Sequence, residues 1–179
     1  MVRLFIAIDF PDSVIEQITN ICHSVPGARW TPSEQLHCTL KFIGEVDNHA
    51  YHDIAEALEH ISFSSFLLRL KGTGFFPPRK PPRILWVGIE QNPLLVQLVD
   101  SIDTMLKRIG VKPERRKFHP HVTVARLRDR VRPSDITPFL SATGLFKTEE
   151  FKVSEFALYS SILKPQGAIH RIERSYALH

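Results

Sequence analysis

Short apolar runs separated by turn residues divide the chain into a series of predicted strands and helices. Runs rich in β-branched and aromatic residues are typical of strands. They lie at 3–10, 35–46, 66–76, 84–90 and 121–127, with a short extended segment expected at 29–31. Two later runs, VSEFALYSSIL and IHRIERSYAL, predict a closing hairpin that turns at Pro165, Gln166 and Gly167.

Four segments carry apolar residues at three-and-four spacing, which favours amphipathic helices. They lie at 14–25, 48–61, 92–110 and 133–142. The third has the clearest ends, with Asn92 as N-cap, Pro93 in the first helical position and Gly110 as terminator. The proline-rich PPRKPPR at 77–83 excludes a helix there and predicts a stiff, positively charged loop between two strands.

The order of these elements predicts an α+β fold. Helices lie between strands in the first half, a hairpin closes the second, and no glycine-rich nucleotide-binding loop follows the first strand. A chain of 179 residues can bury a real core but is short for two independent units. We therefore expect a single domain over 1–179.

The composition, 43% hydrophobic and 23% charged, is that of a globular protein. The longest apolar run is about that of ILWVGI, far shorter than the roughly 20 residues that span a membrane. Cys22 and Cys38, one on a predicted helix and one on a predicted strand, form no disulfide framework. We expect no membrane association and a cytoplasmic protein.

The net charge of +4 is unevenly distributed. Between Lys112 and Arg132 the chain has eight Lys and Arg residues, Arg115 among them, against Glu114 and Asp129. Clustered cations attract a polyanion such as nucleic acid. The same cluster is also compatible with an ordinary solvated charged face.

The chain contains two copies of one short pattern, a histidine, any residue and a threonine. LHCTLKF carries it at His37 and Thr39, and HPHVTVA carries it at His121 and Thr123. Because side chains alternate along a strand, each histidine shares a face with its threonine. Alternation also predicts that Lys41 shares the face of His37, while Cys38, Leu40 and Phe42 lie in the core.

Two imidazoles and two hydroxyls form a chemically coherent set. Imidazole titrates near pH 6.5, so one ring can accept a proton while the other donates one. A threonine hydroxyl donates to a phosphate oxygen from a stiff side chain. We therefore expect the two elements to bind one phosphate diester between the histidines, as in-line displacement requires. A single His-x-Thr would be an ordinary feature of a half-buried strand, so the hypothesis depends on the second copy.

The remaining histidines suggest other roles. Four of them lie on or next to predicted helices and are interpreted as surface or packing residues: His23, His49, His52 and His60. His119 and His121 share a strand face, and Cys38 is next to His37 in sequence, which raises a metal site as an alternative. That alternative is weak because Cys38 points away from His37 and no neighbouring carboxylate completes a ligand set.

The segments LHCTLKFIGEV and FHPHVTVARL, with RLFIAIDF and PRILWVGIE, resemble the two-histidine phosphoesterases. The resemblance covers essentially the whole chain, and is to the RNA 2′,3′-cyclic phosphodiesterases, first called 2′-5′ RNA ligases. It implies a bilobal α+β fold with two antiparallel sheets facing across a central cleft and helices on the outer faces. It also implies hydrolysis of an RNA 2′,3′-cyclic phosphate end to a 2′-phosphate, without metal or nucleotide cofactor.

The resemblance also implies roles for individual residues. His37 would be the proton donor to the leaving 3′ oxygen, and His121 the proton acceptor that activates water. Thr39 and Thr123 would bind phosphate oxygens, and Arg126 would be a further substrate contact. Simple alternation places Arg126 opposite Thr123, so this last role requires a bulge or a rim position. Reverse 2′-5′ ligation is also implied.

The sequence also suggests three further substrate contacts and two alternative functions. Phe76, Arg83 and Trp86 are candidates for contact with a terminal base, although core packing is the simpler role for Trp86. A non-catalytic RNA-binding module and a phosphodiesterase for small cyclic nucleotides remain as alternative functions. We expect a monomer whose partner is RNA with a 2′,3′-cyclic phosphate end.

Overall fold

The computed structural model describes residues 1–114, 116–165 and 167–179. Arg115 in the basic segment and Gln166 in the closing turn lie outside these residues. The strands are β1 (Val2–Ile8), β2 (Ala28–Trp30), β3 (Cys38–Val46), β4 (Phe66–Leu68), β5 (Leu70–Phe76), β6 (Ile84–Ile89), β7 (His121–Leu127), β8 (Phe151–Val153), β9 (Glu155–Lys164) and β10 (Gly167–Ala177). The helices are α1 (Asp12–Ile21), α2 (Asn48–Glu59), α3 (Pro93–Arg108), α4 (Pro133–Thr143) and a 3-10 helix at Ser33–Gln35.

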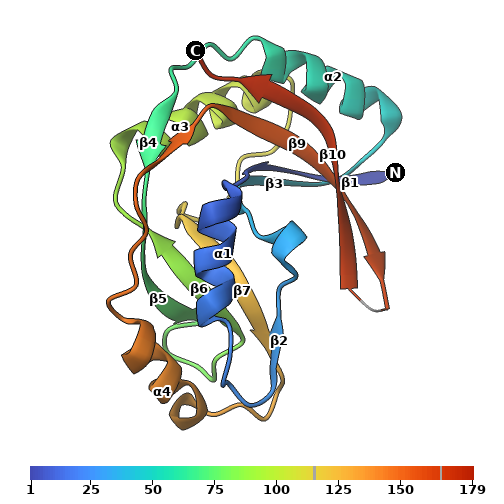
Figure 1. The fold of residues 1–179 in the computed structure, drawn as a ribbon. Helices are drawn as coiled ribbons and strands as arrows, with labels where there is room; N and C mark the ends of the chain where they lie inside the picture. The colour runs from blue at the N-terminus through green and yellow to red at the C-terminus, as the bar shows by residue number, and fades with distance from the viewer. Residues whose placement is uncertain (115, 166) are drawn as a thin grey trace.

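The expected α+β class is confirmed, and both sheets are antiparallel (Figure 1). The large sheet has the order β10-β9-β1-β3-β7-β6-β5, with β2 also paired to β7, and β4 pairs with β8 in a small sheet. Within the described residues, β3 and β7 share a single pair, Cys38 with Val122. We call the strands β10, β9, β1 and β3 the first lobe, and β7, β6, β5 and β2 the second lobe.

The segment 66–76, expected to be one strand, forms two strands with different partners. Phe66–Leu68 pairs with β8, whereas Leu70–Phe76 pairs with β6. The partner of the first strand, β8, lies far along the chain, so the apolar pattern alone does not show where one pairing ends and the other begins. The strand expected from Gln35 likewise begins at Cys38, because a 3-10 turn occupies Ser33–Gln35.

The helices lie where their caps and apolar faces place them. The side chain of Asn92 accepts hydrogen bonds from the Leu94 and Leu95 amides, as its position before Pro93 predicts. α3 contacts both α2 and β3, and Figure 1 shows α2 and α3 together beside the first lobe. In the described ranges, no helix is both long and apolar enough to cross a bilayer.

Both strands that carry the His-x-Thr pattern contain a β-bulge directly after the threonine. In β3, Thr39 pairs with Ala7 but Lys41 pairs with Ile6, so Leu40 is the extra residue. In β7, Thr123 pairs with Trp86 but Ala125 pairs with Leu85, so Val124 is the extra residue. An extra residue shifts the alternation of every side chain beyond it.

The bulge in β3 makes two of the sequence expectations wrong. Lys41 is buried, with 3% of its surface exposed, whereas Phe42 is 64% exposed. Simple alternation had assigned these two residues the opposite way, because it assumed an uninterrupted strand. On the buried side, the Lys41 ammonium pairs with the Asp103 carboxylate of α3 at 2.6 Å. α3 therefore covers the face of β3 opposite His37.

Candidate active site

The two motif histidines lie at the junction of the lobes. His37 and His121 come directly before Cys38 and Val122, the pair that joins β3 to β7. Continuing this antiparallel register by one residue places His37 opposite Thr123 and Thr39 opposite His121. The structure thus brings together two elements that lie more than eighty residues apart in the sequence.

Each imidazole is influenced by the backbone two residues earlier. Nδ1 of His121 lies 2.6 Å from the carbonyl oxygen of His119. The backbone of Gln35 acts on His37, where it raises the pKa of the ring. When Nδ1 donates to a carbonyl, Nε2 is left free to accept or donate a proton. The geometry at His121 therefore presents Nε2 to a ligand.

Each ring also lies against an aromatic side chain. Phe5 stacks on His37 with ring centroids 5.0 Å apart, and Phe76 meets His121 edge-on at the same separation. Phe5 belongs to a small buried cluster with Ala7, Ala157 and Tyr159, separate from the main core. These contacts partly shield both histidines from water.

Burial keeps both histidines neutral in the free protein. It lowers the pKa of His37 to about 4, assisted by the neighbouring His170 and, less strongly, by His121, while the Gln35 backbone bond opposes the shift. Burial also lowers the pKa of His121, against the opposing effect of its bond to His119.

The two threonines lie beside the histidines, as expected. Both are half-buried, and within the described residues neither hydroxyl makes a hydrogen bond to another protein group. Because the apolar neighbours of Thr39 and Thr123 in sequence face the core, the hydroxyls are left on the side of the imidazoles. They are available to donate to a ligand.

Arg126 lies on the same side of the sheet as Thr123, which alternation alone did not allow. The bulge at Val124 shifts the pattern so that Ala125 is buried and Arg126 is exposed. Arg126 also approaches the first lobe, since its positive charge adds to burial in lowering the pKa of His170. The bulge that this role required is present.

His170 is the part of the site that sequence reasoning missed. Its ring centroid lies 5.3 Å from that of His37 and 4.9 Å from that of Phe5. Its Nδ1 is buried and has no hydrogen-bond partner in the described part of the chain. The side chain of Gln35 donates to the Ala168 carbonyl oxygen at 2.9 Å and holds this part of β10 in place. Nothing in the local sequence shows that β10 reaches His37.

The three residues suggested as base contacts have different surroundings: Trp86 packs against Gly74, Phe76 contacts the site histidines, and Arg83 forms an ion pair. The Trp86 ring lies against Gly74, where an added Cβ would come within 2.2 Å of Cζ2, and it also approaches Phe76. Phe76 contacts the rings of both His119 and His121. Arg83 forms an ion pair with Asp129, which joins the end of the proline-rich loop to the turn after β7.

The arrangement around His119 offers few metal ligands. The ring centroids of His119 and His121 are 5.9 Å apart, and Cys38 is fully buried, with burial raising the pKa of its thiol to about 12. Among residues 1–114, 116–165 and 167–179, no group of three or more His, Cys, Asp or Glu side chains could hold a metal ion.

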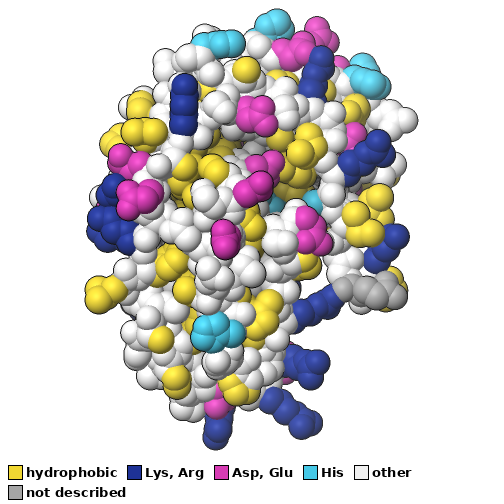
Figure 2. All heavy atoms as spheres, viewed as in Figure 1, with side chains coloured by type: hydrophobic (Ala, Val, Ile, Leu, Met, Phe, Trp, Pro, Cys, Tyr) yellow, Lys and Arg dark blue, Asp and Glu magenta, His cyan; other side chains and the backbone are white. Residues whose placement is uncertain are grey.

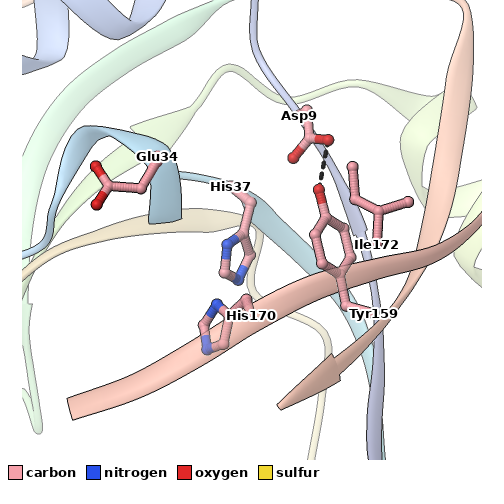
Figure 3. A pocket seen from close by; sticks show the side chains of 6 residues that line it. All are labelled: Asp9, Glu34, His37, Tyr159, His170 and Ile172. Atoms are coloured by element: carbon pink, nitrogen blue, oxygen red, sulfur yellow. Dashed lines mark hydrogen bonds between the residues drawn. The ribbon is translucent and has the colours of Figure 1, made fainter. Parts of the chain in front are cut away.

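A pocket of about 330 Å³ opens beside His37 (Figure 3). Its lining residues are Asp9, Glu34, His37, Tyr159, His170 and Ile172. Figure 3 shows Glu34 on one side of His37 and the hydrogen-bonded Asp9 and Tyr159 on the other. His121 does not line this pocket, so the pocket extends from the His37 side of the site.

Comparison with known proteins assigns the chain to a class of phosphoesterase. The family model described as LigT like Phosphoesterase matches twice, over residues 8–86 and 87–170, and each match contains one His-x-Thr element. The chain therefore belongs to the LigT-like phosphoesterase family. The resemblance inferred from the sequence is confirmed at this level.

Individual relatives agree with this assignment. The RNA 2′,3′-cyclic phosphodiesterase of Archaeoglobus fulgidus is 34% identical over 94% of this chain and 96% of its own. That of Escherichia coli is 34% identical over 89% of this chain and 86% of its own. The crystal structure of E. coli LigT complexed with 3′-AMP has a TM-score of 0.80 and 28% identity, covering 99% of this chain and 98% of that one.

Proposed function

We propose that this chain hydrolyses the 2′,3′-cyclic phosphate at the end of an RNA strand to a 2′-phosphate. The observation that carries the proposal is the position of His37 and His121 beside Cys38 and Val122, the residues that pair β3 with β7, each histidine with a threonine two residues further on. The relatives named RNA 2′,3′-cyclic phosphodiesterase support the substrate class. The complex of E. coli LigT with 3′-AMP supports nucleotide binding in this fold.

In the proposed reaction the two histidines transfer one proton each. His121 takes a proton from water as its oxygen bonds to phosphorus, and His37 gives a proton to the 3′ oxygen as the P–O3′ bond breaks. The product is a 3′ hydroxyl and a 2′-phosphate. An in-line displacement requires the donor and the acceptor on opposite sides of phosphorus.

The negative charge of the substrate favours the protonated form of His37, which the free protein lacks at neutral pH. With a pKa of about 4, the imidazole of His37 is almost entirely unprotonated at neutral pH. A phosphate anion bound beside the ring favours its protonated form and raises its pKa. Substrate binding therefore prepares the proton donor, and His37 gives up its proton when the 3′ oxygen leaves.

Thr39, Thr123 and Arg126 hold the phosphate in this proposal. The hydroxyls donate to the non-bridging oxygens, and the guanidinium compensates the negative charge that develops on them. Proton transfers alone balance the hydrolysis, so the proposed step uses no metal and no nucleotide cofactor. With a 5′ hydroxyl in place of water, the same displacement would form a 2′-5′ linkage: the 5′ oxygen bonds to phosphorus, the P–O3′ bond breaks and the 3′ oxygen takes a proton. We further propose that the chain acts as a monomer whose single domain has two pseudo-symmetric lobes.

Mass analysis of an oligonucleotide that ends in a 2′,3′-cyclic phosphate tests the function directly. We expect the protein, in the presence of EDTA, to add one water to the oligonucleotide and leave a 2′-phosphate end. Binding with an unchanged terminus after prolonged incubation would instead indicate a non-catalytic RNA-binding module. Turnover of isolated cyclic nucleotides without turnover of oligonucleotides would indicate a small-molecule phosphodiesterase.

A further inference from the structure

Two arginines lie directly opposite each other in the second lobe. Arg29 of β2 pairs with Arg126 of β7 in the antiparallel register. Residues opposite each other in such a pair project from the same face, with Cβ atoms about 5 Å apart. Trp30, the next residue of β2, packs against Phe139 on the other face. Because Arg126 lies on the side of Thr123, the Arg29 side chain also projects on the side of the site.

The two guanidinium groups have no carboxylate beside them. Among the described residues, neither Arg29 nor Arg126 forms an ion pair with an Asp or Glu side chain. The neighbour of Arg126 on its other side, in β6, is the apolar Ile84. The first lobe shows a compensated arrangement, in which Arg3 of β1 pairs with Glu45 of β3 and forms an ion pair with it at 3.1 Å. Like charges directly opposite each other destabilise a sheet, so an anionic ligand would relieve the repulsion between Arg29 and Arg126.

Arg29 lies where the second lobe meets the hairpin of β9 and β10. Its Nη2 atom is 3.0 Å from the position that a Cβ on Gly167 would occupy. His170, whose ring contacts that of His37, comes three residues after Gly167, which is roughly 10 Å along an extended strand. The charge of Arg126 acts on His170, where it contributes to the lowered pKa of the ring. The two guanidinium groups therefore lie beside different residues of β10, and Arg29 is the one farther from His37.

The wider surface favours a polyanion in the same region. Figure 2 shows Lys and Arg side chains mainly along the lower right edge of the molecule, where Figure 1 places the ends of β2 and β7 and the turn of the hairpin. Asp and Glu side chains lie nearer the middle of that face. Clustered cations attract the phosphates of a single RNA strand. An RNA strand that leaves the site past Arg29 would therefore remain in a positive field.

An RNA end carries a second negative charge close to the reacting one. The terminal ribose bears the cyclic phosphate on its 2′ and 3′ oxygens, and its 5′ oxygen belongs to the phosphodiester that leads to the preceding nucleotide. One ribose therefore separates two anionic phosphates. Arg126 contacts the first phosphate in the proposed reaction, which leaves Arg29 for the second. A guanidinium suits a phosphodiester because its planar fork donates two parallel hydrogen bonds to two oxygens.

We propose that Arg29 binds the phosphodiester that joins the terminal nucleotide to the rest of the RNA, and thereby makes the enzyme prefer an RNA end to a cyclic mononucleotide. The proposal rests on the function proposed above. The second phosphate supplies the negative charge that the pair of Arg29 and Arg126 lacks. Arg29 is a binding residue here and takes no part in proton transfer. It distinguishes substrates by length, because a cyclic mononucleotide with a free 5′ hydroxyl has no second phosphate.

Two dinucleotides that end in a 2′,3′-cyclic phosphate test the proposal. One has a natural phosphodiester between its nucleosides, and the other has an uncharged methylphosphonate in the same place. We expect kcat/KM to be about tenfold higher for the charged dinucleotide, mainly through a lower KM, since a hydrogen bond to a charged group has an effect of this order. Arg29→Met should bring this ratio close to one by lowering kcat/KM for the charged dinucleotide.

Arg171→Met is the matched control for Arg29→Met. Arg171 is also exposed, and it comes directly after His170 on β10, so its side chain projects on the face away from the site. Its replacement should preserve the ratio between the two dinucleotides. Thermal unfolding checks the fold of Arg29→Met, and its midpoint should not fall, because the substitution removes the repulsion with Arg126.

The outcomes separate this proposal from the proposed function. Equal kcat/KM for the two dinucleotides in the native protein, or a ratio that survives Arg29→Met, would overturn the assignment of Arg29 while leaving the hydrolytic function intact. The same conclusion would follow if Arg29→Met slowed both dinucleotides equally, or if Arg171→Met also removed the preference. A marked fall in the unfolding midpoint of Arg29→Met would show a structural role and would contradict the proposal. Failure of the native protein to hydrolyse either dinucleotide would count against the proposed function itself.

Discussion

Cys38 of β3 and Val122 of β7 form the pair that joins the two lobes, and each is preceded by a histidine. The imidazoles therefore come from different lobes but are each one residue from a shared backbone contact. This position limits how far the rings can separate while the lobes stay joined.

Replacing either motif histidine should abolish most of the activity without unfolding the protein. We expect His37→Gln and His121→Gln each to lower kcat/KM on a cyclic-phosphate oligonucleotide by about 10²–10⁴-fold, since general acid or base catalysis contributes factors of this size. Thermal unfolding should remain cooperative in both. His52→Gln on the exposed side of α2 is the control and should retain full activity. Near-normal turnover in either motif variant would exclude the proposed mechanism.

Arg126→Met should weaken substrate binding and also change the titration of His170. Loss of a charged phosphate contact should raise KM about tenfold or more. Burial, and after it the Arg126 guanidinium, lowers the pKa of His170, so removal of the guanidinium should raise that pKa. Steady-state kinetics and an NMR titration of the His170 ring measure the two effects.

Arg128→Met is the matched control, because Arg128 is also exposed and follows β7 directly. It removes the same charge from nearly the same place and should change neither KM nor the His170 titration by a comparable amount. Equal effects of the two substitutions would mean that Arg126 acts only through the general positive field.

The stability of the protein should fall on acidification, in part because of His37. In the unfolded chain this residue takes up a proton near pH 6.5, whereas in the folded protein it does so only near pH 4. The unfolded state therefore binds more protons between these values, and folding loses about 2 kcal/mol from this group between pH 7.5 and pH 5. Denaturant unfolding at the two pH values should show a smaller loss in His37→Gln than in the native sequence. An equal loss in both would contradict the lowered pKa.

The ion pair between the buried Lys41 and the partly exposed Asp103 should respond differently to removal of one partner and of both. The Lys41 ammonium is almost inaccessible, and beyond Asp103 it has no hydrogen-bond partner among the described residues. Asp103→Ala leaves this charge without its partner and should cost about 2–3 kcal/mol of stability, less than for a pair buried on both sides, because the Asp103 side chain is 39% exposed. Adding Lys41→Met should recover most of that loss, because methionine fills similar space without a charge. Asp100→Ala, at an exposed position of α3, should have little effect on the midpoint of urea unfolding.

Local chemistry in the sequence predicted most of the secondary structure. The helix at Pro93–Arg108 follows from Asn92, Pro93 and a regular apolar face, none of which depends on distant residues. The strand at His121–Leu127 likewise follows from its own composition. The two histidines were found for a related reason, since a repeated motif can be recognised without knowing how the chain folds.

The expectations that were wrong or missing depend instead on how the strands pair, which local sequence does not show. Whether Lys41 or Phe42 is buried depends on the bulge at Leu40, which is defined by the register between β3 and β1. The contact of His170 with His37 depends on the order β10-β9-β1-β3 across the sheet. Neither register nor strand order is encoded in the local pattern of apolar and polar residues.

The matching bulges after Thr39 and Thr123 have a consequence for the origin of the site. They occur at the same position in the two motifs, on either side of an antiparallel pair that has local two-fold symmetry. A half-length ancestor that paired with a second copy of itself through this strand would have held two identical imidazoles around one axis. Fusion of the copies into one polypeptide would then have freed each ring to evolve separately, one toward giving a proton and the other toward taking it.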